Sequence, residues 1–191
     1  MDENNKQYFE LFTIRDVPVF LHFSSVIALT LFFLLWLIDD FSYFIFYFAV
    51  FPIIIIHELG HAYYAQKLNC NVNSICIYVI HGLCNYDEAD TLYDNAKIAW
   101  GGVLAQFVVL LITTALVLLF GFPQSDYFSK YILCFQVGNI GMLILNLIPF
   151  DPLDGKTAWK IIPLWYRHNF KKDIKNPKDS KKSVSHLRVI K

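Results

Sequence analysis

Two histidines and a glutamate in a five-residue motif carry the clearest chemistry in this sequence. His57, Glu58 and His61 belong to the pentapeptide His-Glu-Leu-Gly-His, which directly follows the almost purely apolar run 44–56. In a helix, residues four apart share one face, so His57 and His61 can hold a single Zn²⁺. Glu58 adjoins the first histidine and can take a proton from a water at the metal. The motif predicts metal-dependent hydrolysis.

The apolar run before the motif predicts that this chemistry takes place in a membrane. Ionisable side chains at the edge of a bilayer are costly, so they indicate a functional site. Apolar residues make up 56% of the chain, and charged residues only 17%, against about 25% in soluble domains. The formal net charge is zero, yet nine of the sixteen Lys and Arg lie in the segment 167–191. A length of 191 residues allows one compact domain.

Four apolar segments approach the roughly 20 residues that a helix needs to cross a bilayer. They are about Val17–Ile38, Phe41–Lys67, Ala96–Phe120 and Tyr127–Ile148. The connections at 39–40 and 121–130 contain Lys130 as their one basic residue. The other basic residues belong to the N-terminus, the middle connection and the C-terminal tail, and loops rich in Lys and Arg stay in the cytoplasm. We therefore expect a multi-pass protein of the cell membrane, with both termini and the active site toward the cytoplasmic side.

The expected fold class is an all-α polytopic membrane protein with about four transmembrane helices and a small β-hairpin or sheet between the second and third. The segment Val72–Ile80 is rich in Val, Ile and Tyr, and a turn at His81-Gly82 follows it. An interfacial C-terminal helix is expected around Trp159 and Trp165, which we interpret as membrane anchors rather than chemical groups. The expected domains are a core at 1–166 and a basic cytoplasmic tail at 167–191.

A catalytic zinc site usually has three protein ligands and leaves a fourth position for water. Two prolines interrupt the helix in the run 146–155. Irregular backbone at membrane depth is tolerated where it is buried in protein or lines a watery cavity. Asp154 lies in this irregular segment, at the same expected depth as the histidines, and is the expected third ligand. The alternatives that the sequence leaves open are Asp151, His81 and His22.

One Zn²⁺ per chain is the expected cofactor, although two histidines and a carboxylate also suit iron. The cysteines form no CxxC pair, so a thiolate site is not expected. We expect them to be reduced and unpaired, because most of them lie near the cytoplasmic side. They are Cys70, Cys76, Cys84 and Cys134.

The two motifs together resemble the site-2 intramembrane metalloproteases. The HExxH motif of that family stands at 57–61, and its NxxPxxxLDG motif stands at 146–155 with every defined position matched. Within the family, the chain looks most like the compact bacterial branch that includes sporulation pro-sigma-factor processing enzymes. The resemblance covers about 15–165. It departs from the usual pattern at Val103, where proline is common, and at Gln106, where asparagine is common, so the role of Gln106 stays open.

This resemblance implies hydrolysis of a peptide bond in or near the membrane segment of a membrane-tethered protein substrate, as in regulated intramembrane proteolysis. His57, His61 and Asp154 would hold the zinc, and Glu58 would activate its water. Asn146 would position the substrate or stabilise the oxyanion, unless it is a helix-capping or helix-packing amide. The implied partners are the substrate and the lipid bilayer, with no nucleic acid. A regulatory membrane protein and the oligomeric state are left open.

A substrate must be extended before it is cut, because helical amides are already hydrogen-bonded. We expect the strand within Val72–Ile80 to hold it by edge pairing.

Three other interpretations compete with an intramembrane protease. A membrane zinc protease with a downstream glutamate ligand fits poorly, because no glutamate follows Glu88. A catalytically silent membrane-embedded metal-binding or trafficking factor needs a cause outside the motifs, since all the candidate ligands are present. A transporter would justify intramembrane charges, but four segments without an evident repeat fit that class poorly.

Overall fold

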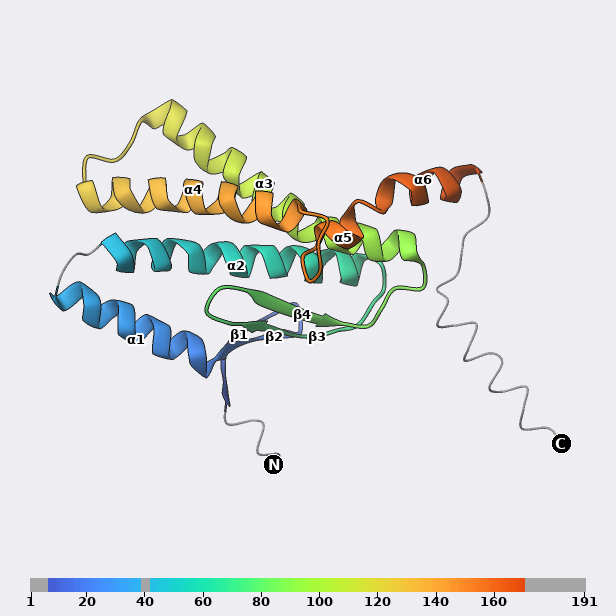
Figure 1. Ribbon diagram of the computed structural model, residues 1–191, viewed down its shortest axis with the longest axis horizontal. Helices are drawn as coiled ribbons and strands as arrows, with labels where there is room; N and C mark the ends of the chain where they lie inside the picture. Colours follow the sequence, from blue (N-terminus) through green and yellow to red (C-terminus); the bar gives the residue numbers. More distant parts are fainter. Residues whose placement is uncertain (1–6, 39–41, 171–191) are drawn as a thin grey trace.

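The computed structural model describes residues 7–38 and 42–170, and within these ranges it contains four strands and six helices (Figure 1). The strands are β1 (Tyr8–Ile14), β2 (Val17–His22), β3 (Val72–Ile77) and β4 (Gly82–Tyr86). The helices are α1 (Phe23–Ile38), α2 (Ser42–Lys67), α3 (Leu92–Phe120), α4 (Asp126–Leu147), α5 (Gly155–Ala158) and α6 (Ile161–Phe170). Figure 1 shows α2 in the middle, with α3 and α4 on one side and the sheet and α1 on the other.

Among the described residues, three helices are long and apolar enough to cross a membrane: α2 over Phe44–Lys67, α3 and α4. The apolar helix α1 has 16 residues, fewer than the roughly 20 that a span needs. A mostly helical protein with a small sheet is therefore confirmed, whereas a fourth spanning helix stays a prediction. The expected turn at 39–40 lies outside the described residues.

The first apolar segment does not begin as a helix, so the helix expected from Val17 is wrong in its first six residues. Val17, Val19 and Leu21 are 3%, 0% and 7% exposed, and the residues between them are partly exposed. This period of two belongs to a strand. The three side chains pack in one cluster with Ile54 of α2, which fastens β2 to the helix that carries the HExxH motif.

The four strands form one sheet in the order β1-β2-β3-β4. β1 and β2 are antiparallel, and Arg15 and Asp16 between them both have positive φ angles, as a tight hairpin turn requires. β2 and β3 are parallel, and β3 and β4 are antiparallel. The expected hairpin is confirmed, but it is half of a larger sheet. In the described part of the chain β4 pairs only with β3, so β4 has a free edge.

Helices α2 and α3 approach each other through glycines. A Cβ atom at Gly60 would overlap the backbone carbonyl of Gly101, and a Cβ at Gly101 would overlap that of Gly60. The two backbones are therefore in direct contact, as small residues allow between membrane helices. This contact lies one residue before His61, so it brings α3 against the HExxH motif.

A helix, α6, lies near the C-terminus, but it begins at Ile161, so Trp159 falls outside it. The expected interfacial C-terminal helix stays a prediction. α6 continues to Phe170, past the domain boundary expected after 166. The rest of the expected basic tail, 171–191, lies outside the described residues.

Candidate active site

Two side chains of α2 meet one from the loop that follows α4. The Nε2 atom of His57 lies 2.8 Å from Oδ2 of Asp154, and Nε2 of His61 lies 3.1 Å from the same oxygen. The two Nε2 atoms are 2.9 Å apart. His57 and His61 are buried, and the Asp154 side chain is 25% exposed. Within 7–38 and 42–170, these residues form the group of histidine, cysteine and carboxylate side chains that could hold a metal ion.

Both imidazole rings are fixed through their other nitrogen. The Nδ1 atom of His61 is 2.8 Å from the carbonyl oxygen of Ile98, and Nδ1 of His57 is 3.0 Å from Oε1 of Gln106. A carbonyl oxygen only accepts hydrogen bonds, so each Nδ1 carries a proton and donates it. Each Nε2 of a neutral ring then offers a lone pair toward Asp154. Two lone pairs and a carboxylate oxygen this close repel one another unless a cation lies among them: a proton in the metal-free protein, which then makes the hydrogen bonds to Asp154, or a metal ion. The donor set of two imidazoles and a carboxylate fits a zinc ion.

Glycine at position 102 leaves the space that these rings occupy. A Cβ atom at Gly102 of α3 would lie 2.6 Å from Nε2 of His61 and 2.7 Å from Nδ1 of His57. Gly101 thus allows the helix contact, and Gly102 leaves room for the two candidate ligand rings.

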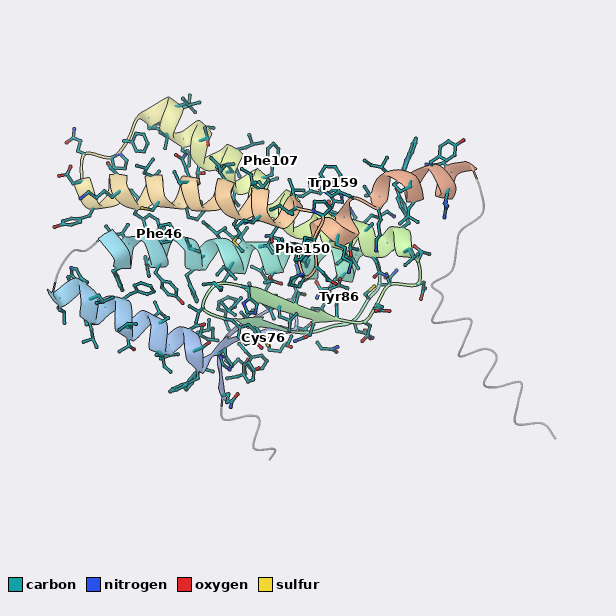
Figure 2. The ribbon with its side chains drawn as sticks, viewed as in Figure 1. Phe46, Cys76, Tyr86, Phe107, Phe150 and Trp159 are labelled. Carbon is teal, nitrogen blue, oxygen red and sulfur yellow. The ribbon has the colours of Figure 1, made fainter. Side chains whose placement is uncertain are left out.

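Asp154 is presented by a short loop between α4 and α5, which two indole groups close. The Nε1 of Trp159 donates to the carbonyl oxygen of Leu147 at 2.7 Å, across the base of the loop. The Nε1 of Trp100 donates to the carbonyl oxygen of Ala158 at 2.9 Å and ties α5 to α3. Trp159 is labelled in Figure 2 near the contact of α5 with α3. The sequence-based interpretation of Trp159 as an anchor therefore omitted a structural role.

The ionised state of Asp154 is favoured by its partners. Burial alone would raise the pKa of this carboxyl, but hydrogen bonds with His57 and His61 outweigh burial and hold the pKa below its usual range. Asp154 is therefore a carboxylate, as a metal ligand must be.

Glu58 is buried one residue after His57 and packs against β4. A Cβ atom at Gly82 would lie 2.6 Å from Oε1 of Glu58. Glu58 and Gly82 line a cavity of about 580 Å³ together with the three candidate ligands. Other walls of this cavity come from β4 and from the end of α4. The structure therefore places a buried carboxylate and the candidate metal group on one cavity.

Asn146 lies at the end of α4 and lines the same cavity. Its Nδ2 is 3.4 Å from each ring nitrogen of His57, at the long end of hydrogen-bond distances. Its predicted role toward a substrate stays a prediction.

The three alternative ligands do not join the metal group. His81 lines the cavity but stacks on Tyr78, with ring centroids 4.7 Å apart. Asp151 pairs with Lys156, and Nδ1 of His22 lies 2.7 Å from the Ser24 hydroxyl. The four cysteines are free, as expected.

From the sequence, no role at the site was assigned to Gln106, Gly82 or Gly102. A signal existed for Gln106, because an amide in the middle of an apolar helix is expensive. Glycine carries no comparable signal until its neighbour is known.

A solved structure of the site-2 protease from Methanocaldococcus jannaschii superposes on this chain with a TM-score of 0.67, covering 86% of this chain and 74% of that one. The chain has the site-2 protease fold. The two sequences are 22% identical over this match, so the likeness by itself concerns architecture.

A curated protein of the same organism, named zinc metalloprotease MJ0392, is 24% identical over 181 residues. These residues make up 94% of this chain and 52% of the relative, so the chain spans about half the length of the relative that it matches. No protein-family model matches the chain. The relative and the solved structure together support assignment to the site-2 protease family, as the paired motifs predict.

Proposed function

We propose that this chain is an intramembrane zinc metalloprotease that hydrolyses a peptide bond in or near the membrane segment of a membrane-tethered protein, in regulated intramembrane proteolysis. The observation that carries the proposal is the convergence of His57, His61 and Asp154 beside buried Glu58 on one cavity. The names of the relative and of the solved structure, a zinc metalloprotease and a site-2 protease, support it.

In the proposed hydrolysis, the metal and the side chains have separate roles. Zinc held by the three ligands would act as a Lewis acid and make a water nucleophilic near neutral pH. Glu58 accepts the proton of that water and later gives it to the leaving amine. The amide of Asn146 reaches into the cavity and can donate to the carbonyl oxygen as negative charge develops there.

The substrate is proposed to bind as an extended segment along β4. The strand within Val72–Ile80, which the sequence favoured for edge pairing, is the wrong one, because β3 is already paired with β2 and β4. β4 has the free edge, and Gly82, Leu83 and Cys84 line the cavity. A chain that adds to this edge satisfies its backbone groups by main-chain hydrogen bonds and passes Glu58.

The membrane placement is part of the proposal. The candidate site lies at the end of α2 that leads to β3, and the basic residues of the 67–97 connection favour the cytoplasm on that side. We therefore place both termini and the active site toward the cytoplasm, with the lipid bilayer and a membrane-tethered protein as partners. A regulatory membrane protein and the number of chains in an assembly stay open.

The first test measures bound metal in detergent-purified wild type, Asp154→Asn and the control Asp151→Asn. We expect about one zinc per wild-type chain, a strong reduction in Asp154→Asn, and the wild-type value in the control, because Asp151 pairs with Lys156 outside the site. A folded wild type without metal would contradict the proposal. Zinc binding without any proteolysis would favour the catalytically silent factor.

Glu58→Gln separates metal binding from catalysis. It should keep the zinc and lower the cleavage rate by about 10²–10⁴-fold, because an amide cannot accept the proton. An unfolded, fluorescently labelled soluble protein is a suitable probe, since its amides are free. Turnover near the wild-type rate would rule out the role given to Glu58.

A further inference from the structure

Two amide side chains are completely buried between the apolar helices of the bundle. Gln106 of α3 is 0% exposed, and Asn139 of α4 is 1% exposed. In a bilayer, each polar group without a partner costs free energy, because hydrocarbon offers no hydrogen bonds. Packing alone therefore does not explain why amide side chains occupy these two positions.

These amides form a chain of contacts that ends at a metal ligand. Oε1 of Gln106 accepts from Nδ1 of His57 at 3.0 Å, linking α3 to α2. Nδ2 of Asn139 donates to the backbone oxygen of Gln106 at 3.2 Å, linking α4 to α3. This series of contacts thus joins the three helices of the described structure that are long enough to span the membrane.

In each of the two amide side chains, only one of the two polar atoms makes one of these hydrogen bonds. In the described part of the protein, Nε2 of Gln106 and Oδ1 of Asn139 are buried without a hydrogen-bond partner. A buried polar atom without a partner destabilises the folded protein. An apolar side chain of similar shape would avoid this loss, so the fold alone gives no reason for Gln106.

We infer that Gln106 is a positioning residue for the metal centre: its Oε1 holds the proton of His57 on Nδ1, so that Nε2 faces the metal, and Asn139 fixes the backbone of Gln106. This inference rests on the proposed function. Without an acceptor at Nδ1, the proton can move to Nε2, and His57 then offers no lone pair to zinc. Partners of this kind typically change metal affinity by about 10–100-fold.

The test compares two nearly isosteric replacements in the full-length, detergent-purified protein. Gln106→Met removes the acceptor, and Gln106→Glu keeps one. Zinc affinity is measured by competition with a chromophoric chelator, and the thermal unfolding of the metal-free protein is measured beside it. We expect about 10–100-fold weaker zinc binding in Gln106→Met, with unchanged or higher stability. Gln106→Glu should bind zinc like the wild type, even though a buried charge makes it less stable.

If zinc affinity only followed the stability of the fold, the two variants would rank in the opposite order. The more stable Gln106→Met would then bind zinc like the wild type, and the less stable Gln106→Glu would bind it more weakly. That result would overturn the inference. The absorption spectrum after cobalt substitution adds a second readout, since a change in Gln106→Met shows that the ligand geometry depends on this amide. If Gln106→Glu does not fold, the comparison of Gln106→Met with the wild type decides alone.

Two further variants complete the design. Gln136→Leu is the matched control, because this amide contacts Thr114 rather than the site, and its zinc affinity should not change. Asn139→Leu should weaken zinc binding less than Gln106→Met does, and a wild-type affinity would remove Asn139 from the inference. A wild type that binds no zinc would overturn the proposed function and this inference together. A wild type that binds zinc, with unchanged affinity in Gln106→Met, would overturn the inference alone.

Discussion

At the residue scale, both candidate histidine ligands are held through Nδ1 and present Nε2 to Asp154. His61 relies on a backbone carbonyl and His57 on a side-chain amide. The backbone acceptor for His61 depends only on how α2 and α3 cross. The acceptor for His57 is a side chain, which a mutation can remove. We therefore expect zinc affinity to be sensitive to the sequence around His57 and insensitive to the side chain at Ile98.

The position of Glu58 depends on the absence of a side chain at Gly82. Gly82→Ala places a methyl group where Glu58 now lies, so the carboxylate must move. We expect zinc binding to be kept and the cleavage rate to fall by about 10–100-fold, because a shift of about 1 Å in a catalytic group has effects of that size. Gly141→Ala on α4 is the matched control, since a Cβ atom there meets no other atom within 4 Å. Equal rates in Gly82→Ala and wild type would show that Glu58 has room to adjust.

At the element scale, the sequence predicted the helices that carry the motifs better than the strands. The long apolar runs of α2, α3 and α4 are unambiguous, because few other structures need so many apolar residues in a row. β2 could not be recognised from the sequence, because Val17–His22 continues directly into the apolar helix α1. In addition, Phe20 is apolar, so it obscures the alternation of Val17, Val19 and Leu21. Its pairing with β3 is a long-range contact that local patterns do not encode.

The loop that presents Asp154 is an element whose closure can be tested. Trp159→Phe removes the donor to the Leu147 carbonyl and keeps most of the ring. A hydrogen bond contributes about 0.5–1.5 kcal/mol, so zinc affinity should fall by about 2–10-fold. Trp165→Phe on α6 serves as the control. An unchanged affinity in Trp159→Phe, measured by chelator competition, would mean that the loop is held by other contacts.

At the scale of the whole molecule, the candidate site is assembled around α2. This helix contacts the sheet, α1, α3 and α4, and it carries His57, Glu58 and His61. The paired motifs indicated that His57 and Asp154 meet, although they are 97 positions apart. They could not indicate which residues pack around the candidate ligands, because these residues come from β4 and from Gly102 of α3, which meet α2 only in the folded chain.

The turn between α3 and α4 lies at the end of the bundle away from α5 (Figure 1), and most of its residues are exposed. Cutting the chain between Phe122 and Ser125 divides the site into two halves. One fragment keeps both histidines and Glu58, and the other keeps Asn146 and Asp154. Because preformed membrane helices can associate side by side, the separately encoded fragments should reassemble when they are produced together. Full zinc binding should then be a property of the pair and of neither fragment alone, which makes metal content a measure of complementation.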